Sequence, residues 1–281
     1  MNWLCIKQHS PVVLRTYDNT PMDDREAGRY WEENAEVWTR LARQGWDIFR
    51  DHLNTPAFLD LLPDVRGLVG LDLGAGEGHN TRLVAQRCAA LYAIDIAPTF
   101  LKNAQASGGG IHYAVASAQR LPFPDATFDF VTAFMSLMDM PQPERALEEV
   151  RRVLKPGGFL QFSIPHPCTD TVHRRHIKNA EGRTYAMEVG GYFAHIDGQV
   201  DEWIFHSAPP EVTDGLRKFR TPRFQRTVSD WLNMVVDAGL RIERVAEPQA
   251  SDEAAARFPK LRATQVVLFL LHLRCRKAGR R

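Results

Sequence analysis

The spacing of hydrophobic and polar residues changes along the chain. Between residues 68 and 164, short apolar segments alternate with amphipathic ones, and this pattern predicts strands joined by helices. The predicted strands are Leu68–Leu73, Ala90–Ile96, Ile111–Ala116, Phe128–Phe134 and Phe159–Ile164, and the predicted helices are His79–Cys88, Pro98–Gln105 and Pro143–Leu154. Such an alternation indicates an α/β fold with a parallel sheet covered on both faces.

The segments before and after this alternation have different patterns. Asp23–Arg43 has apolar residues at helical spacing, and Thr55-Pro56 suits the start of a second helix, because proline is favoured at a first helical position. Residues 165–226 show no sustained period and are rich in His, Arg, Gly, Pro and aromatic residues. After them we expect a helix at Val228–Ala238 and strands at Leu240–Val245 and Gln265–Arg274.

These patterns predict a single domain over residues 1–281. Its parts are a loose N-terminal arm and helical cap (1–62), a core (68–164), an insertion (165–226) and a C-terminal helix with strands (227–281).

Composition narrows the classes of function. The 35 basic and 34 acidic side chains give a net charge of +1, which argues against a protein that holds a long nucleic acid. The four cysteines form no CxxC pair, so we expect reduced thiols and no metal site. No signal sequence and no bilayer-spanning apolar run is visible, so a cytoplasmic protein without a membrane partner is expected.

The clearest candidate chemistry lies where the first strand ends. Gly74, Gly76 and Gly78 alternate in a turn before a helix, where glycine permits a sharp turn and the helix start offers free N–H groups. His79 stands where a dinucleotide-binding fingerprint would have its third glycine, which disfavours a dinucleotide-dependent oxidoreductase. Asp72 can meet an ammonium group directly or through water, and Asp95, at the end of the second strand, can accept the hydroxyls of a ribose.

The stretch from Leu68 to Pro165 resembles the cofactor half of class I S-adenosylmethionine (SAM)-dependent methyltransferases. The resemblance rests on LDLGAGEG, YAIDI, ASAQRLPFPDATFDFVTAF and LEEVRRVLKPGGFLQFSIP, four motifs in the family's order. It implies a doubly wound, mostly parallel seven-stranded sheet whose last, antiparallel strand is Gln265–Arg274. It also implies SAM as the cofactor, released as S-adenosylhomocysteine.

The resemblance further implies which residues hold the cofactor. The methionine portion would contact Gly74, Ala75, Gly76, Asn80 and Met135. The ribose would contact Asp95. The adenine would contact Ile96, Ser117, Ala118 and Gln119. Family members often close this pocket with an aromatic residue from an N-terminal segment, which here makes Tyr30 and Trp38 candidates. The alternative for both aromatic residues is a place in the core.

The acceptor is expected beyond the carboxyl ends of the strands. His166, which directly follows the fifth strand between two prolines, is the first candidate for a general base, and Asp139 is a candidate to orient a base or hold an amine. A hydrogen bond within the loop for His166, and a helix cap for Asp139, are the alternatives.

The expected function is methyl transfer to a small, apolar or aromatic acceptor by a monomer or homodimer. O-methylation of a phenol, N-methylation of an amine and C-methylation of an indole-like ring remain open. A macromolecular (RNA or protein) methyltransferase and a non-catalytic binding protein are the rival functions.

Overall fold

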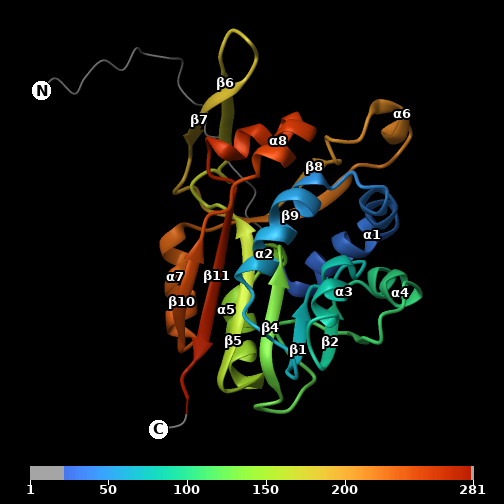
Figure 1. Cartoon of the computed structure of the whole chain (residues 1–281), viewed down its shortest axis with the longest axis vertical. Coiled ribbons are helices and arrows are strands. Elements are labelled where there is room, and N and C mark those ends of the chain that lie inside the picture. The colour runs from blue at the N-terminus through green and yellow to red at the C-terminus, as the bar shows by residue number, and fades with distance from the viewer. Residues whose placement is uncertain (1–21, 280–281) are drawn as a thin grey trace, which may run out of the picture.

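The computed structural model describes residues 22–279, so the arm predicted at residues 1–20 lies outside the described residues. A seven-stranded sheet forms the centre, in the order β10-β11-β5-β4-β1-β2-β3 (Figure 1). Only β11 runs antiparallel to its neighbours, which confirms the predicted fold class. The strands are β1 (Val69–Leu73), β2 (Ala90–Asp95), β3 (His112–Val115), β4 (Phe128–Phe134), β5 (Leu154–Pro165), β10 (Leu240–Ala246) and β11 (Leu270–Lys277).

Both faces of the central strands are buried. On β5, Leu160, Phe162 and Ile164 belong to the core beneath α5 (Pro143–Val153) and α7 (Val228–Asp237). Phe130 and Phe159 face the opposite side and belong to the core beneath α2 (Thr55–Leu61) and α3 (His79–Ala85). A strand buried on both faces has a nearly continuous apolar sequence, which is why the central strands were predictable. The helix α4 (Pro98–Ala106) packs beside β2 and β3.

The predicted cap is present. The helix α1 (Asp24–Arg43) begins after Asp23, whose side chain accepts a hydrogen bond from the N–H of Glu26 at 2.7 Å. It packs against α4 and β9 (Phe219–Gln225). A short π-helix, η1 (Arg50–Asn54), then leads into α2. Turns of π-helix occur often at functional sites.

The insertion consists mainly of two antiparallel hairpins, β6 (His173–Lys178) with β7 (Thr184–Gly190), and β8 (Ile196–Trp203) with β9. They lie beyond the carboxyl ends of β1, β4 and β5 (Figure 1), and the short helix α6 (Pro210–Thr213) joins β8 to β9. No hydrophobic period is visible in this part of the sequence because most side chains of these strands are half-buried or exposed.

Near the C-terminus the last strand begins later than predicted, at Leu270 instead of Gln265. Helix α8 (Asp252–Arg257) and the 3-10 helix η3 (Pro259–Gln265) precede it, and Val266 and Leu268 are exposed. Their apolar side chains made this segment look like a strand.

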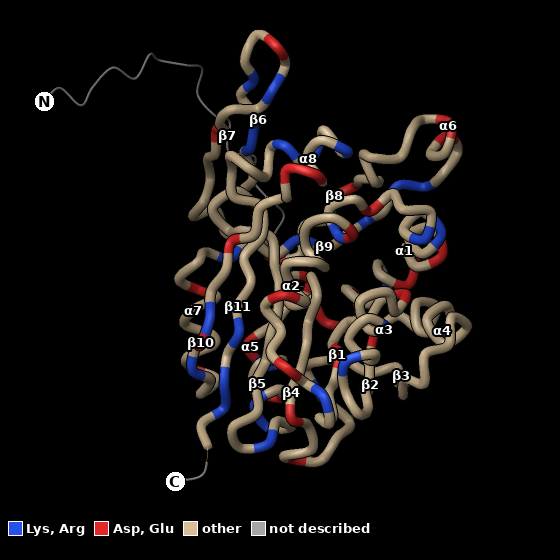
Figure 2. The backbone as a smooth tube through the Cα atoms, viewed as in Figure 1, with Lys and Arg blue, Asp and Glu red and all other residues tan. Residues whose placement is uncertain are grey.

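Acidic and basic residues are interspersed over the elements seen in Figure 2. Among residues 22–279, no helix has the length and apolar character needed to cross a membrane. Cys88, Cys168 and Cys275 are free thiols.

Candidate cofactor and acceptor site

The glycine turn after β1 is tied to β2 by its backbone. The N–H groups of Gly74 and Ala75 both donate to the carbonyl of Ile94 at 2.9 Å. Gly74 has a φ of +70°, and a Cβ there would lie 2.4 Å from the Cβ of Ser136, so only glycine fits. At Gly76, with φ +54°, a Cβ would meet no atom within 4 Å. The turn is therefore packed tightly on one side and open on the other, as a loop that receives a ligand must be.

Asp95 is fixed in place by this turn. Its Oδ2 accepts the N–H of Gly76 at 2.8 Å, its Oδ1 accepts the N–H of Ala97 at 2.9 Å, and the residue is 7% exposed. Burial raises the pKa of Asp95 to about 6, so its carboxylate is mostly ionised at neutral pH. The backbone N–H of Ile96 also acts on this carboxylate. Because two carboxylate oxygens have four lone pairs, at least one remains for a further donor, such as a ribose hydroxyl.

Asp72 is buried below the turn with both oxygens engaged. Thr132 of β4 donates to its Oδ1 at 2.7 Å and Thr81 of α3 donates to its Oδ2 at 2.6 Å. Burial raises the pKa of Asp72 to about 6. The residue thus joins β1, β4 and α3, and its contact with an ammonium group stays a prediction.

The end of β4 brings a second segment to the turn. Met135 has a φ of +49°, an unusual value for a residue other than glycine, and its N–H donates to the carbonyl of Ser163 at 3.1 Å. The hydroxyl of Ser136 donates to the carbonyl of Leu73 at 2.7 Å. The 3-10 helix η2 (Leu137–Asp139) therefore starts directly beside the glycine turn. Strained residues of this kind cluster at functional sites.

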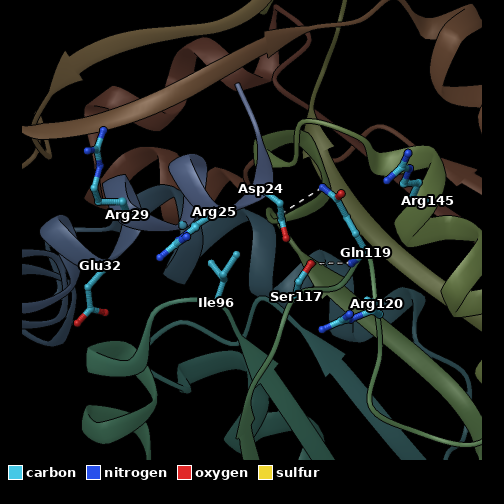
Figure 3. Close-up of a pocket in the computed structure, with 10 residues that line it drawn as sticks. Asp24, Arg25, Arg29, Glu32, Ile96, Ser117, Gln119, Arg120 and Arg145 are labelled. Carbon is cyan, nitrogen blue, oxygen red and sulfur yellow. Dashed lines mark hydrogen bonds between the residues drawn. The ribbon is translucent and has the colours of Figure 1, made fainter. Parts of the chain in front are cut away.

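A pocket of about 640 Å³ opens between α1, the end of β2 and the loop after β3. Three of the residues predicted to contact adenine line it: Ile96, Ser117 and Gln119 (Figure 3). Gln119 points toward α1, where its Nε2 donates to Asp24 Oδ1 at 3.1 Å, and its N–H donates to Ser117 Oγ at 3.0 Å. Ala118 is buried against the core, and only its backbone is suited to a ring nitrogen.

The two aromatic candidates of α1 pack against the second hairpin. Tyr30 is buried with Phe224, and the guanidinium of Arg220 lies 4.9 Å from its ring. Trp38 is surrounded by further aromatic rings, with Phe219 of β9 at 4.7 Å between centroids. The positions of both match the core alternative, and their contact with the cofactor stays a prediction. Asn80 lies early in α3, where its Oδ1 accepts the Thr55 hydroxyl at 2.7 Å.

His166 follows β5 as expected and is 3% exposed. Its Nδ1 accepts the N–H of Cys168 at 3.2 Å, which leaves Nε2 as the protonated nitrogen, 2.9 Å from Glu247 Oε1. Both nitrogens therefore have protein partners. A role as base stays a prediction, and it requires the imidazole to give up one of these bonds.

Asp139 lies at the end of η2 and is half-buried. Burial raises its pKa well above the usual range, and the negative charge of Asp170 adds to the effect. It does not cap α5, whose N-cap is Gln142. Its catalytic role also stays a prediction.

Comparison with known proteins agrees with this geometry. The model of the "Methyltransferase domain" family matches residues 71–162. The crystal structure of an S-adenosylmethionine-dependent methyltransferase from Mesorhizobium loti is 26% identical, with a TM-score of 0.64 over 79% of this chain and 96% of that one. Residues 71–162 thus match a methyltransferase domain, and the chain has the fold of the class I SAM-dependent methyltransferases.

Two further relatives extend the comparison. The ubiquinone/menaquinone biosynthesis C-methyltransferase UbiE of Cronobacter sakazakii is 35% identical over 144 residues, which are 45% of this chain and 57% of that protein. The chain thus spans little more than half the length of this curated relative. The 1,6-didemethyltoxoflavin-N1-methyltransferase of Burkholderia thailandensis shares the fold, with a TM-score of 0.53 at 16% identity over 92% of this chain and 94% of that one.

The cofactor of this family is SAM, and the residues of this chain fit it. The open side of the turn at Gly76, the carboxylate of Asp95 and the pocket lined by Ile96 all lie at the carboxyl ends of β1 and β2. A nucleoside held by its ribose and base requires these features.

Sequence reasoning missed several residues around the pocket. Gly28 of α1 approaches so closely that a Cβ there would lie 2.8 Å from Ile96 Cδ1. A glycine in the middle of a helix was the available signal. Glu32 accepts both the N–H and the hydroxyl of Thr99, at 3.0 and 2.6 Å, which holds α1 on α4. The other pocket residues without a prediction are Asp24, Arg25, Arg29, Arg120 and Arg145.

Proposed function

We propose that this protein transfers a methyl group from SAM to a small organic acceptor. The observation that carries the proposal is the buried carboxylate of Asp95, which is held by the N–H groups of Gly76 and Ala97 and directly precedes Ile96, a residue that lines the pocket. When bound, SAM supplies a methyl group that is already activated on a sulfonium. The protein therefore has to hold the acceptor in line with that methyl group and exclude water.

The residues around the end of β4 are suited to hold the acceptor. Met135 packs with Phe49 of the cap and Phe269, and the rings of the two phenylalanines stack at 4.6 Å between centroids. Met135 directly precedes Ser136, which contacts the glycine turn, so this cluster lies at the carboxyl end of β4, where an open sheet binds its ligands. These apolar side chains suit an apolar or aromatic molecule.

Among the three chemistries expected from the sequence, we favour methylation of a carbon in an electron-rich ring. The UbiE proteins of Cronobacter sakazakii and Bordetella avium, which are named as C-methyltransferases, support this choice at 35% and 36% identity. The position of His166 supports it as well, because both of its ring nitrogens are engaged and neither is free to deprotonate an amine. We further propose a cytoplasmic protein, acting as a monomer or homodimer without a nucleic-acid partner.

Calorimetric titration with SAM and with S-adenosylhomocysteine tests the first half of the proposal. We expect micromolar-range binding that Asp95→Ala weakens by about 100-fold, since charge-assisted hydrogen bonding to the ribose is lost. The control is Asp60→Ala, on an exposed position of α2, which leaves binding unchanged. Failure of the folded wild-type protein to bind either ligand would overturn the proposal.

Mass spectrometry tests the second half. The protein is incubated with SAM and with hydroxylated aromatic compounds, indoles and amines, and products are sought at a mass increase of one methylene. Fragmentation then separates methylation at carbon from methylation at oxygen or nitrogen. Products methylated only at nitrogen or oxygen would contradict the preference for carbon.

A further inference from the structure

Arg226 directly follows β9 and reaches the segment after η2. Its Nη2 donates to the carbonyls of Met140 at 3.1 Å and Pro141 at 2.8 Å. The guanidinium also lies 5.3 Å from the ring of Phe224 and 5.8 Å from that of Trp231. Two carbonyls and two rings thus hold this side chain in one orientation, and it connects the second hairpin to the end of β4.

One nitrogen of this guanidinium has no partner. Nη1 is closed off from water, and no group among residues 22–279 accepts a hydrogen bond from it. Buried donors without an acceptor are rare in folded proteins, because the missing bond costs about 1–3 kcal/mol. An acceptor atom from a bound molecule would supply the bond.

The unsatisfied groups concentrate in this part of the fold. Seven buried side-chain atoms lack a partner within the described chain, and four of them lie on the second hairpin and the residue after it. Gln225 is informative, because its Nε2 donates to the carbonyls of Gly191 and Tyr192 at 2.6 and 3.1 Å. These two bonds fix which end of the amide is the oxygen, and that oxygen is unpaired.

Asp139 supplies the complementary group. Its carboxyl and the guanidinium of Arg226 act on each other's charge, yet the described residues show no hydrogen bond or ion pair between them. Asp139 lies four residues after Met135, whose strained backbone adjoins the glycine turn. The two side chains therefore belong to the edge of the sheet at which a methyl group would leave the cofactor.

We propose that Asp139 and Arg226 together bind an ionisable hydroxyl group on the ring of the acceptor. This assignment rests on the proposed methyltransferase function and adds the class of acceptor. A hydroxyl group satisfies both side chains at once, since its O–H donates to the Asp139 carboxylate and its oxygen accepts from Arg226 Nη1. An ammonium group has no lone pair for Arg226, and a ketone has no proton for Asp139.

The pair also prepares the acceptor for reaction. The O–H bond breaks, its proton goes to the Asp139 carboxylate, and the electron pair stays on the oxygen and spreads into the ring. Arg226 stabilises the resulting oxyanion. The total charge of Asp139 and acceptor is unchanged by this transfer, so surrounding carboxylates do not oppose it. A carboxyl with a raised pKa takes the proton at a smaller cost than an ordinary one.

The charged groups around the pair come from several elements. Glu144, Asp197 and Asp230 act on Arg226 in addition to Asp139, while Asp170 acts on Asp139. Asp170 itself is paired with Arg174 and Arg223. An acceptor that carried a full negative charge from the start would meet these acids unfavourably. The arrangement therefore selects a neutral hydroxyl that ionises in the site.

A matched pair of probes tests the assignment. We would titrate the protein, saturated with S-adenosylhomocysteine, with 2-naphthol and with 2-methoxynaphthalene, which lacks the hydroxyl proton. We expect 2-naphthol to bind at least tenfold more tightly, because a site built around a hydroxyl rejects the analogue without it. The absorbance of the naphtholate should also show that the bound probe ionises at lower pH than free 2-naphthol.

Variants assign the effect to residues. Arg226→Met should abolish both the preference and the shift in ionisation, Arg226→Lys should retain part of each, and Asp139→Asn should abolish the preference. Arg183→Met, at an exposed position of the same insertion, is the control and should behave as wild type. Binding of S-adenosylhomocysteine to each variant shows that it is folded.

The outcomes separate this assignment from the function on which it rests. Lack of binding of S-adenosylhomocysteine to the folded wild type overturns both. If that ligand binds normally, three results overturn the hydroxyl assignment alone. These are equal affinity for the two probes, no binding of either probe, and an unchanged preference for 2-naphthol in Arg226→Met.

Discussion

Arg50 in the π-helix of the cap contacts Glu77 in the middle of the glycine turn, with its Nη1 3.3 Å from Oε1. Arg43 at the end of α1 and Arg82 of α3 each reach Oε2 of the same carboxylate at 3.2 Å. The Glu77 side chain is only 3% exposed. One buried carboxylate thus joins three elements to the turn that would hold the methionine portion of SAM, so closure of the cap and shape of the turn depend on each other.

Glu77→Gln tests this dependence. The substitution keeps the shape of the side chain and removes its charge. Arg43 and Arg82 then lose their counter-ion, while Arg50 keeps its ion pair with Asp51. We expect a loss of about 3 kcal/mol in the free energy of unfolding, the usual cost of breaking a buried ion pair, together with weaker SAM binding. Urea denaturation and calorimetry measure the two effects. Asp64→Asn removes an exposed partner of Arg66 and should change neither. Unchanged stability in Glu77→Gln would show that the arginines are held by other contacts.

Binding of SAM should weaken in acid because of Asp95. Its pKa of about 6 in the free protein means that the carboxylate becomes protonated as the pH falls through 6. The ionised form accepts the ribose hydroxyls more strongly, so affinity is full above pH 7 and falls below 6. Calorimetry between pH 5 and 8 measures this loss. Asp95→Asn should bind weakly at every pH without the fall, and an equally steep fall in that variant would assign the effect to another group.

The sequence made the sheet and the cofactor loop predictable, because both depend on neighbours in the chain. β4 was predicted with its observed bounds, since all its residues but one are fully buried and apolar or small. The turn at Gly74 and the acid at Asp95 depend on local geometry that only certain residue types permit. In contrast, β9 contains Pro222 and two arginines, which disfavour a strand by composition. It forms because β8 and α1 lie on either side of it.

The parts of the site that the sequence did not reveal involve residues far apart in the chain. Arg226 meets the carbonyl of Met140 across 86 positions, and Gln119 meets Asp24 across 95. Periodicity and motif spacing describe only local order, so neither predicts such pairs. His166 combines both cases. Its position directly after β5 was predicted correctly, but its partner Glu247 lies 81 residues away in the chain and was not predicted.

His272 should make the fold less stable in mild acid. It is fully buried on β11, its Nε2 lies 2.8 Å from Asn54 Oδ1 in the π-helix, and burial lowers its pKa to about 4. Between the unfolded pKa of 6.5 and the folded value of about 4, the unfolded chain binds the additional proton. The stability is therefore full above pH 6.5 and decreases as the pH falls toward 4, by about 3 kcal/mol in total.

The measurement for His272 is a series of urea denaturations from pH 7.5 to 4.5, for the wild type and for His272→Gln. Asp72 and Asp95 have raised pKa values and act in the opposite direction, so the difference between the two proteins isolates the histidine. That difference should shrink as the pH falls. His206→Gln, at an exposed position, should run parallel to the wild type. A difference between wild type and His272→Gln that does not vary with pH would contradict the assignment.

Gly28→Ala should weaken SAM binding although alanine favours helices. In an exposed helix this change stabilises by about 1 kcal/mol. Here the new Cβ would lie 2.8 Å from both Cδ1 and Cγ1 of Ile96, so α1 has to move away from the edge of the pocket. We expect an affinity for SAM about tenfold lower, with little change in the secondary structure seen by circular dichroism. The double variant Gly28→Ala with Ile96→Ala removes the clash and should recover affinity relative to Ile96→Ala alone. If Gly28→Ala weakens binding equally in both backgrounds, the glycine acts through the backbone of α1, and its contact with Ile96 is not the cause.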